Sequence, residues 1–300
     1  AIFITYDDAR GDWPFSVKPI MKNVARYKAV TIINRFPAMV RHIDSEIENQ
    51  IKKIEDPFTR IAFGVNLVTF PINYSETLSD ITVDSLTYLL KSMITAIKYT
   101  VEASKEIGFE FIPVYPFFNI GPLAGGSQSR LHAQVYIDLN MDGHGAFMEN
   151  ILQAYDEQRK SGYCHLCTSR HNGRIVYENK TWISWATSSP RRNFHLRIAP
   201  KRHVERVTDL DELEIRELAI TFIYISKAYD MVGVNQNRNI VIYMNPYGYA
   251  SYFHMFIDFL PFERLGGIEI LDSCRVAKMS PFDVADIMRK SIEKIESTME

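Results

Sequence analysis

A strand–strand–helix–strand–strand order of apolar segments occurs twice along this 300-residue chain. Short β-branched and aromatic runs bounded by proline or glycine predict strands, and apolar residues at helical spacing predict helices. The first set comprises strands at 29–36 and 61–70, a helix at 82–98, and strands at 109–118 and 135–139. The second comprises strands at 174–185 and 194–198, a helix at 209–229 that Asp209 is expected to cap, and strands at 240–244 and 253–260. A last helix is predicted at 281–296.

Two pairs of short motifs support an internal duplication. The segment 130–134 (Arg-Leu-His-Ala-Gln) parallels 254–258 (His-Met-Phe-Ile-Asp), and each follows an earlier polar motif, at 69–73 and 199–203, by a similar distance. A polar helical stretch around residue 150 separates the two copies. We therefore expect an α+β protein with two tandem domains, 1–150 and 151–300, each an antiparallel sheet with flanking helices.

Composition excludes several classes of partner. Hydrophobic residues make up 46% of the chain, which is ample for a core, and the net charge of −2 gives no basic excess for nucleic acid or an anionic membrane. Apolar runs such as 240–244 are far too short to cross a bilayer. Three cysteines and no secretion signal favour a reducing cytoplasm.

Tyr-Cys-His-Leu-Cys at 163–167 is the sharpest local motif. The spacing of Cys164 and Cys167 suits two thiolates on one tetrahedral metal ion, and zinc then needs two more ligands. Two unpaired thiols or a redox pair are the alternatives, although the flanking Ser-Gly-Tyr and Thr-Ser-Arg-His-Asn-Gly favour a knuckle and a turn. The candidate further ligands are His165, His171, His195, His203 and His254.

The stretch 119–134 is the second informative one. Gly125, Gly126 and Ser127 allow backbone amides to approach an anion, and Arg130 adds a forked donor suited to phosphate. Because His132 and Gln134 alternate on a predicted strand, both point to one face. A histidine and an amide beside an anion-binding loop favour nucleotidyl or phosphoryl transfer, whereas a glycine-rich hairpin with one hydrogen-bonded histidine is the structural alternative.

These residues resemble a known family. Gly-Gly-Ser-Gln-Ser-Arg-Leu-His-Ala-Gln at 125–134 is similar to the Gly-Ala-Ser-x-x-His-Pro-His-x-Gln motif of galactose-1-phosphate uridylyltransferases, in the histidine-triad superfamily. The zinc knuckle is especially like that of the plant ADP-glucose phosphorylase branch. Further similarities lie at 34–38, 119–121, 164–167, 198–203, His254 with Pro261, 266–269 and 280–281, so that the resemblance extends from about residue 29 to 290.

The resemblance implies two tandem histidine-triad-like domains and a role for each motif. His132 is implied as the nucleophile that becomes nucleotidylated, with Gln134 beside it. The implied substrate-binding residues are Asn34, Phe36, Asn119, Gly126, Ser127, Arg130 and Glu269. The implied zinc ligands are Cys164, Cys167, His203 and His254. Members of the family are usually homodimers in which the partner chain completes the sugar pocket.

Departures from the family pattern are informative. Asn73 and Arg130 stand where relatives have histidine ligands of a first-half metal site, so that site looks lost. Arg130 then becomes either a phosphate clamp or a tie for the loop. Arg35 stands where several relatives have an aspartate near the base, which puts uridine specificity in question. Phe256 occupies the nucleophile's position in the second copy.

The function implied by the resemblance is transfer of UMP between UDP-glucose and galactose-1-phosphate through a covalent nucleotidyl-histidine, in galactose metabolism. The alternative within the family is an ADP-sugar phosphorylase or adenylyltransferase. A non-catalytic nucleotide-binding zinc protein is a different class, and so is a zinc-knuckle protein that binds nucleic acid through the arginines at 170, 174, 191 and 192. Retention of His132 and Gln134 favours an enzyme.

Overall fold

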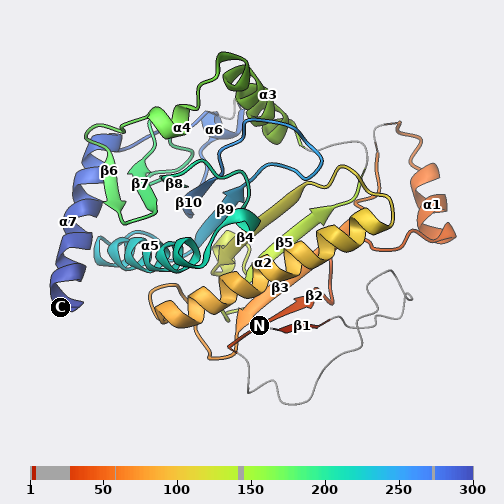
Figure 1. Cartoon of the computed structure of the whole chain (residues 1–300), viewed down its shortest axis with the longest axis horizontal. Helices are drawn as coiled ribbons and strands as arrows, with labels where there is room; N and C mark the ends of the chain where they lie inside the picture. Colours follow the sequence, from red (N-terminus) through yellow and green to blue (C-terminus); the bar gives the residue numbers. More distant parts are fainter. Residues whose placement is uncertain (1, 5–27, 58, 141–144, 272–273, 300) are drawn as a thin grey trace.

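Ten strands form one sheet in the order β1-β2-β3-β5-β4-β9-β10-β8-β7-β6 (Figure 1). The computed structural model describes residues 2–4, 28–57, 59–140, 145–271 and 274–299. Neighbouring strands are antiparallel apart from the parallel pair β1–β2. The strands are β1 (Ile2–Ile4), β2 (Ala29–Ile33), β3 (Gly64–Pro71), β4 (Val114–Ile120), β5 (Ala133–Asp138), β6 (Ile175–Glu178), β7 (Trp182–Ala186), β8 (Leu196–Pro200), β9 (Arg238–Tyr243) and β10 (Phe256–Pro261).

The two halves of the chain build equivalent halves of this sheet. The neighbour order β2-β3-β5-β4 in the first half is repeated as β7-β8-β10-β9 in the second. Antiparallel pairing of β4 with β9 joins them, with Phe117 opposite Val241 and Asn119 opposite Asn239. The predicted antiparallel sheet with flanking helices is therefore confirmed, while the division into domains at residue 150 stays a prediction.

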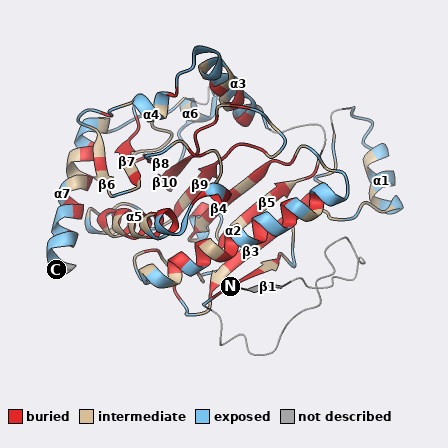
Figure 2. Ribbon diagram, in the orientation of Figure 1, coloured by how far each residue is buried: buried red, intermediate tan, exposed pale blue. Residues whose placement is uncertain are grey.

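Three long helices cover one face of the sheet, namely α2 (Val83–Glu106), α5 (Glu212–Met231) and α7 (Pro281–Met299). Helices α2 and α5 lie side by side, and α7 packs against α5 and the outer strands β6 and β7 (Figure 1). Buried residues concentrate in the strands and on the inward sides of these helices, as Figure 2 shows. None of the helices in the described part of the chain is long and apolar enough to cross a membrane.

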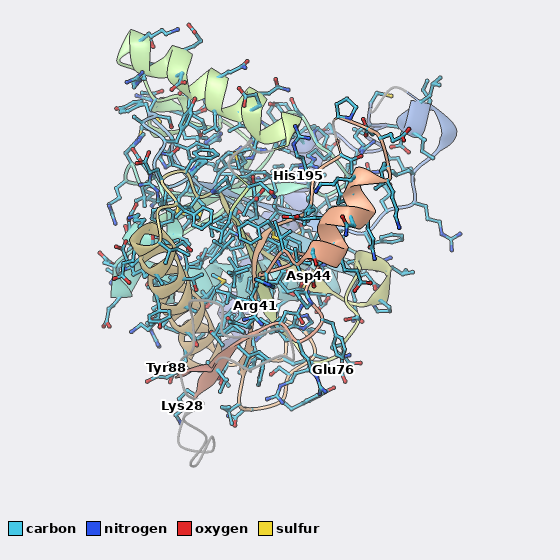
Figure 3. The ribbon with its side chains drawn as sticks, turned by 90° about the vertical axis from the view of Figure 1, so that its right-hand side faces the viewer. Lys28, Arg41, Asp44, Glu76, Tyr88 and His195 are labelled. Carbon is cyan, nitrogen blue, oxygen red and sulfur yellow. The ribbon has the colours of Figure 1, made fainter. Side chains whose placement is uncertain are left out.

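Shorter elements connect the strands and the long helices. They are α1 (Ser45–Lys52), α3 (Ala146–Ser161), α4 (His165–Thr168), α6 (Gly267–Leu271) and the short 3₁₀ turns η2 (Pro122–Ala124) and η3 (Val207–Asp209). Figure 3 views the molecule from the side of α1 and labels its N-cap residue, Asp44, together with Tyr88 on α2.

Period-two alternation along β5 decides which side chains reach the open face. Ala133, Val135 and Ile137 are buried, and α2 contacts this strand, whereas Gln134 and Tyr136 are only half-buried. Strand β4 alternates in the same way, with Asn119 among its half-buried positions. The apolar positions thus anchor both strands, and the intervening positions are free to form a site.

The expected start of the second long helix was wrong. Asp209 ends the 3₁₀ turn η3, and α5 begins at Glu212 with Asp211 as its N-cap. The Asp211 carboxylate accepts from the Glu214 backbone N–H at 2.8 Å, and the Glu214 carboxylate accepts from the Asp211 N–H at 2.8 Å. This reciprocal capping box satisfies two otherwise unpaired donors, which Asp209 is placed too early to do.

The capping box predicts a difference between two neighbouring aspartates. Asp211→Ala is expected to lower the free energy of unfolding by about 1 kcal/mol because it removes the cap, while Asp209→Ala should change it by less than about 0.5 kcal/mol. Urea denaturation of both variants measures this. Equal losses in the two variants would contradict the assigned helix start.

Candidate active site and metal centre

A cavity of about 520 Å³ opens on the sheet face opposite α2 and runs from the end of β2 across β3 and β5 to β4. Its volume is in the range of ordinary small-ligand pockets. Most of the predicted substrate residues of the first half line it. The lining residues are Ile32, Asn34, Arg35, Phe36, Pro37, Ala38, Val68, Phe70, Asn119, Gly125, Ser127, Gln128, Arg130, His132, Gln134 and Tyr136.

His132 lies in this cavity with its ring held at both nitrogens. Nδ1 is 2.7 Å from the backbone carbonyl oxygen of Arg130, and a carbonyl can only accept, so Nδ1 carries the proton. Nε2 therefore has the lone pair, and the side-chain amide of Gln134 donates to it at 3.2 Å. The residue is 8% exposed and lines the cavity. This tautomer is the one a nucleophilic imidazole requires.

The glycine-rich loop folds against Asn119. Gly121 and Gly125 have φ values of 81° and 87°, a region that side chains other than glycine rarely adopt. At Gly126 an added Cβ would lie 2.7 Å from the Asn119 carbonyl oxygen, so the loop closes only over a residue without a side chain. Gly126 therefore allows the loop to close against Asn119, while Gly125 and Ser127 line the cavity itself.

Arg130 ties the loop to the end of β3. Its Nη2 donates to the carbonyl oxygens of Pro71 and, at 2.7 Å, of Ile72, and its guanidinium carbon lies 4.9 Å from the centre of the Phe70 ring. The backbone of the next residue, Leu131, donates to the Ser75 carbonyl at 2.7 Å. Of the two roles weighed for Arg130, the contacts are those of a loop tie, although no carboxylate takes part and the side chain still borders the cavity.

The 34–38 segment closes the β2 end of the cavity. The Asn34 side chain accepts from the Phe36 backbone N–H at 3.0 Å, which turns the chain just after the strand. Phe36 is 83% exposed, and the Arg35 guanidinium carbon lies 5.8 Å from the centre of its ring. An aromatic ring that packs against so little of its own chain is available to a planar ligand.

Glu269 lies outside this cavity, on α6. Its carboxylate accepts from the backbone N–H groups of Gly266 at 2.7 Å and of Val276 at 3.3 Å. These hydrogen bonds lower the pKa of Glu269 and hold the two ends of the α6 segment together. Its predicted role in binding a sugar stays a prediction.

Four side chains converge on a possible metal site. Donor atoms of Cys164, Cys167, His203 and His254 all lie within 4.8 Å of one another. Nδ1 of His254 is 3.4 Å from Sγ of Cys164 and 3.3 Å from Sγ of Cys167, and Nδ1 of His203 is 3.6 Å from Sγ of Cys167. Sulfur–nitrogen separations of about 3.5 Å are those of a tetrahedral zinc site. The set therefore fits one tetrahedral metal ion.

The surroundings orient the two histidines for this task. His254 is fully buried, and its Nε2 is 3.0 Å from the Pro200 carbonyl oxygen, which leaves Nδ1 unprotonated toward the thiols. Tyr155 on α3 donates to the His254 carbonyl at 2.8 Å. Burial lowers the pKa of His254 to about 4, so the ring is in the neutral form that binds metals. The ring of His203 stacks on Tyr252 with centres 4.5 Å apart.

The other candidate histidines lie elsewhere. His165 is exposed, and His171 is buried with its ring stacked 3.8 Å from Trp185. His195, labelled in Figure 3, is buried with its Nε2 3.0 Å from Asp258, whose carboxylate also binds Arg197. The internal repeat indicated His203 and His254 as neighbours, and the structure places them just after β8 and just before β10, beside the two cysteines of the α4 segment.

Some residues that line the cavity were not predicted from the sequence. Tyr136 follows His132 and Gln134 at the same period of two, so alternation alone would have indicated it. Val68 and Phe70 reach the cavity from β3, where Val68 is paired with Gln134 of the neighbouring strand β5. Only the strand register brings these side chains beside the histidine.

Comparison with known proteins agrees with this fold. Residues 169–261 match the family model of the HIT domain. The ADP-glucose phosphorylase of Arabidopsis thaliana is 23% identical over 278 residues, which is 88% of this chain and 74% of that protein. The galactose-1-phosphate uridylyltransferase of Thermotoga maritima is 22% identical over 182 residues, 58% of this chain and 57% of that protein.

A solved uridylyltransferase structure superposes with a TM-score of 0.75 at 20% identity and covers 89% of this chain and 86% of its own. Residues 169–261 thus match a HIT domain, and 89% of the chain shares the fold of that uridylyltransferase structure. The predicted resemblance is confirmed at this level.

Burial of His171 predicts a pH effect. Burial lowers its pKa from 6.5 to about 4, with a smaller contribution from Arg174. Because the unfolded chain takes up the proton first, this contribution to stability is complete above pH 6.5 and is lost as the pH falls toward 4. Between pH 7 and 5, wild type should lose about 1–2 kcal/mol more of its free energy of unfolding than His171→Asn. Urea melts at both pH values measure the difference, and parallel losses would contradict the burial effect.

Proposed function

We propose that the protein is a nucleotidylyltransferase in which His132 carries a nucleoside monophosphate between two phosphate-bearing substrates. The observation that carries the proposal is the His132 ring: Nδ1–H is held by the Arg130 carbonyl, and Nε2 faces a cavity bordered by Gln134 and Asn119. A fixed tautomer removes the need to reorient the ring before attack.

The reaction takes place in two displacements. Nε2 attacks the α-phosphorus of a nucleoside diphosphate sugar, a P–N bond forms, and the bond from phosphorus to the bridging oxygen breaks to release a sugar 1-phosphate. The imidazole is then cationic, and the Arg130 carbonyl stabilises its Nδ1–H. An oxygen of the acceptor next attacks phosphorus, the P–N bond breaks, and the neutral ring is restored. For the attack, the Gln134 amide must release the Nε2 lone pair, and it then holds a non-bridging oxygen together with Asn119 and the backbone near Ser127, which line the same cavity.

UDP-glucose and galactose-1-phosphate are the substrates that we propose first, by analogy with the uridylyltransferases. Adenylyl transfer from ADP-glucose to phosphate is the second candidate. Two observations favour this second candidate. The similarity to the plant ADP-glucose phosphorylase covers more of this chain than the similarity to the uridylyltransferase of Thermotoga maritima. Arg35, which stands where several relatives have an aspartate, borders the end of the cavity where we place the base. The exposed Phe36 ring would stack on either base.

A second copy of the chain accounts for the position of Glu269. The residue lies outside the cavity of its own chain, on a segment where Ile268, Ile270 and Leu271 are 55%, 68% and 83% exposed. Apolar side chains gathered on one exposed segment are typical of an interface. We therefore propose a homodimer in which this segment reaches the partner's cavity and Glu269 binds a sugar hydroxyl.

Zinc is the metal that we propose for the Cys164, Cys167, His203 and His254 set. Two thiolates and two imidazoles in a closed tetrahedral arrangement are typical of structural zinc. The four ligands lie in the α3–α4 region, just after β8 and just before β10. A zinc ion there would hold these parts of the second half together and would not touch the substrate.

Covalent capture tests the proposed function. After incubation with UDP-glucose or, separately, ADP-glucose at mildly alkaline pH, the intact mass should increase by one uridylyl or one adenylyl group. The adduct should be absent in His132→Ala, which removes the nucleophile. Gain from ADP-glucose alone would assign the second candidate.

His42→Ala is a matched control, because the same ring is removed at a position outside the cavity. It should form the adduct like wild type. A correctly folded protein that gains no mass from either donor would contradict the enzymatic proposal and favour a binding protein.

The zinc proposal gives a separate prediction. Cys167→Ser should lose the single zinc and lower the melting temperature by about 5–10 °C, because metal binding contributes folding free energy. Cys274→Ser removes a thiol outside the metal set, so this variant should keep the zinc and the melting temperature of wild type. Metal analysis and thermal melts measure this, and full zinc content in Cys167→Ser would contradict the assigned ligands.

A further inference from the structure

A row of polar side chains continues beyond the cavity onto the second half of the sheet. Asn119 on β4 is opposite Asn239 on β9, and Nδ2 of Asn239 donates to Oδ1 of Asn119 at 2.8 Å. The same amide donates to the Ala124 carbonyl of the glycine-rich loop at 2.8 Å. Asn239 thus fixes the orientation of Asn119, so that the Asn119 amide nitrogen is left for a ligand.

Arg192 extends this row by one more residue. Its Nη1 donates to Oδ1 of Asn239 at 2.8 Å and contacts the carbonyl oxygens of Leu260 and Pro261 at 3.3 and 3.4 Å. Nε and Nη2 make no hydrogen bond to the residues that the structure describes, and neither is among the fully buried polar atoms without partners. These two donors are therefore open to a ligand.

The charge around Arg192 favours an anion. Partial burial lowers its pKa, and Arg191 and Arg275 lower it further. Glu263 acts in the opposite direction and raises the pKa of Arg192, but its carboxylate already accepts from the backbone and side chain of Asn193 and lies 3.3 Å from Lys278. Arginines held together without a paired carboxylate are stabilised when an anion binds among them.

The order of strands sets the direction of the substrate. If the nucleoside occupies the β2 and β3 end of the cavity, its α-phosphorus meets His132 at the start of β5, and the group attached to that phosphorus must continue over β4 toward β9. Strands in a sheet are about 4.8 Å apart, so the row from β5 to β9 spans about 10 Å. Neighbouring phosphorus atoms of a diphosphate are much closer together than this, and the side chains shorten the gap: Asn239 reaches Asn119 at 2.8 Å and Arg192 reaches Asn239 at 2.8 Å.

We propose that Arg192, oriented with Asn239, binds the phosphate of the leaving group and, in the second displacement, of the acceptor. The ligand is a phosphate group, either inorganic phosphate or a sugar 1-phosphate. This inference rests on the proposed function, since the α-phosphorus must lie at His132. Arg192 and Asn239 are not among the residues that line the cavity, so the proposal adds residues of the second half to the substrate site.

The test compares nucleotides that differ by one phosphate. By calorimetry, Arg192→Gln should weaken binding of the nucleoside diphosphate about 10- to 100-fold, the range expected for loss of charge-assisted hydrogen bonds, and leave the monophosphate within about twofold. UMP with UDP and AMP with ADP are both used. A purely structural role for Arg192, acting through Asn239 and Asn119, would weaken both nucleotides equally and overturn the proposal.

Arg216→Gln is the matched control, because the same substitution is made on α5, where the Arg216 guanidinium pairs with Asp84 at 2.7 Å, outside the cavity lining and the arginine cluster around Arg192. It should bind both nucleotides like wild type. Unchanged diphosphate binding in Arg192→Gln would overturn the inference while leaving the proposed function intact. Failure of wild type to bind any of the four nucleotides would overturn the proposed function, and this inference with it.

The second displacement separates the two sources of phosphate. Nucleotidyl-enzyme is prepared with the donor, freed of small molecules and mixed with inorganic phosphate or with glucose 1-phosphate. Arg192→Gln should slow discharge by whichever acceptor wild type uses, again about 10- to 100-fold, while Arg216→Gln discharges normally. Equal discharge rates in wild type and Arg192→Gln would contradict a role in binding the acceptor.

Discussion

Antiparallel pairing of β4 with β9 joins the two halves of the chain into one sheet. The position of the glycine-rich loop, the packing of the long helices and the row of polar side chains toward Arg192 all depend on this pairing. The pairing places Asn119 opposite Asn239, so the loop that follows β4 is held by an amide from the second half. It also sets α2 and α5 side by side on one face. The opposite face is then continuous from the cavity beside His132 toward Arg192.

The two halves use equivalent positions for different purposes. In the first half, His132 and Gln134 point into a cavity. In the second, Phe256 and Asp258 occupy the matching places, Phe256 stacks on Tyr243 at 4.6 Å, and all of β10 is buried. At the matching place the second half has packed aromatic side chains, and it holds a possible metal site. The first half has kept the pocket open and ties its loop with Arg130 instead.

Much of this arrangement followed from the sequence because it depends on local patterns. Alternation put His132 and Gln134 on one face, helical spacing gave α2 and α5, and Cys-x-x-Cys marked the knuckle. The histidine partners of the knuckle, the exact cap of α5 and the distance of Glu269 from the cavity did not follow from local patterns. Each depends on contacts between residues far apart in the chain, such as His254 with Cys164.

The claim that a nucleotide is carried on His132 has one direct kinetic test. Nucleoside diphosphate glucose is incubated with labelled glucose 1-phosphate and no other acceptor, and label in the nucleotide sugar is measured. A covalent intermediate predicts exchange at a rate comparable to turnover, abolished in His132→Ala, because the first displacement is reversible by itself. Absence of exchange in a protein that nevertheless turns over with a second acceptor would contradict the account, since it would require direct transfer between the two bound substrates.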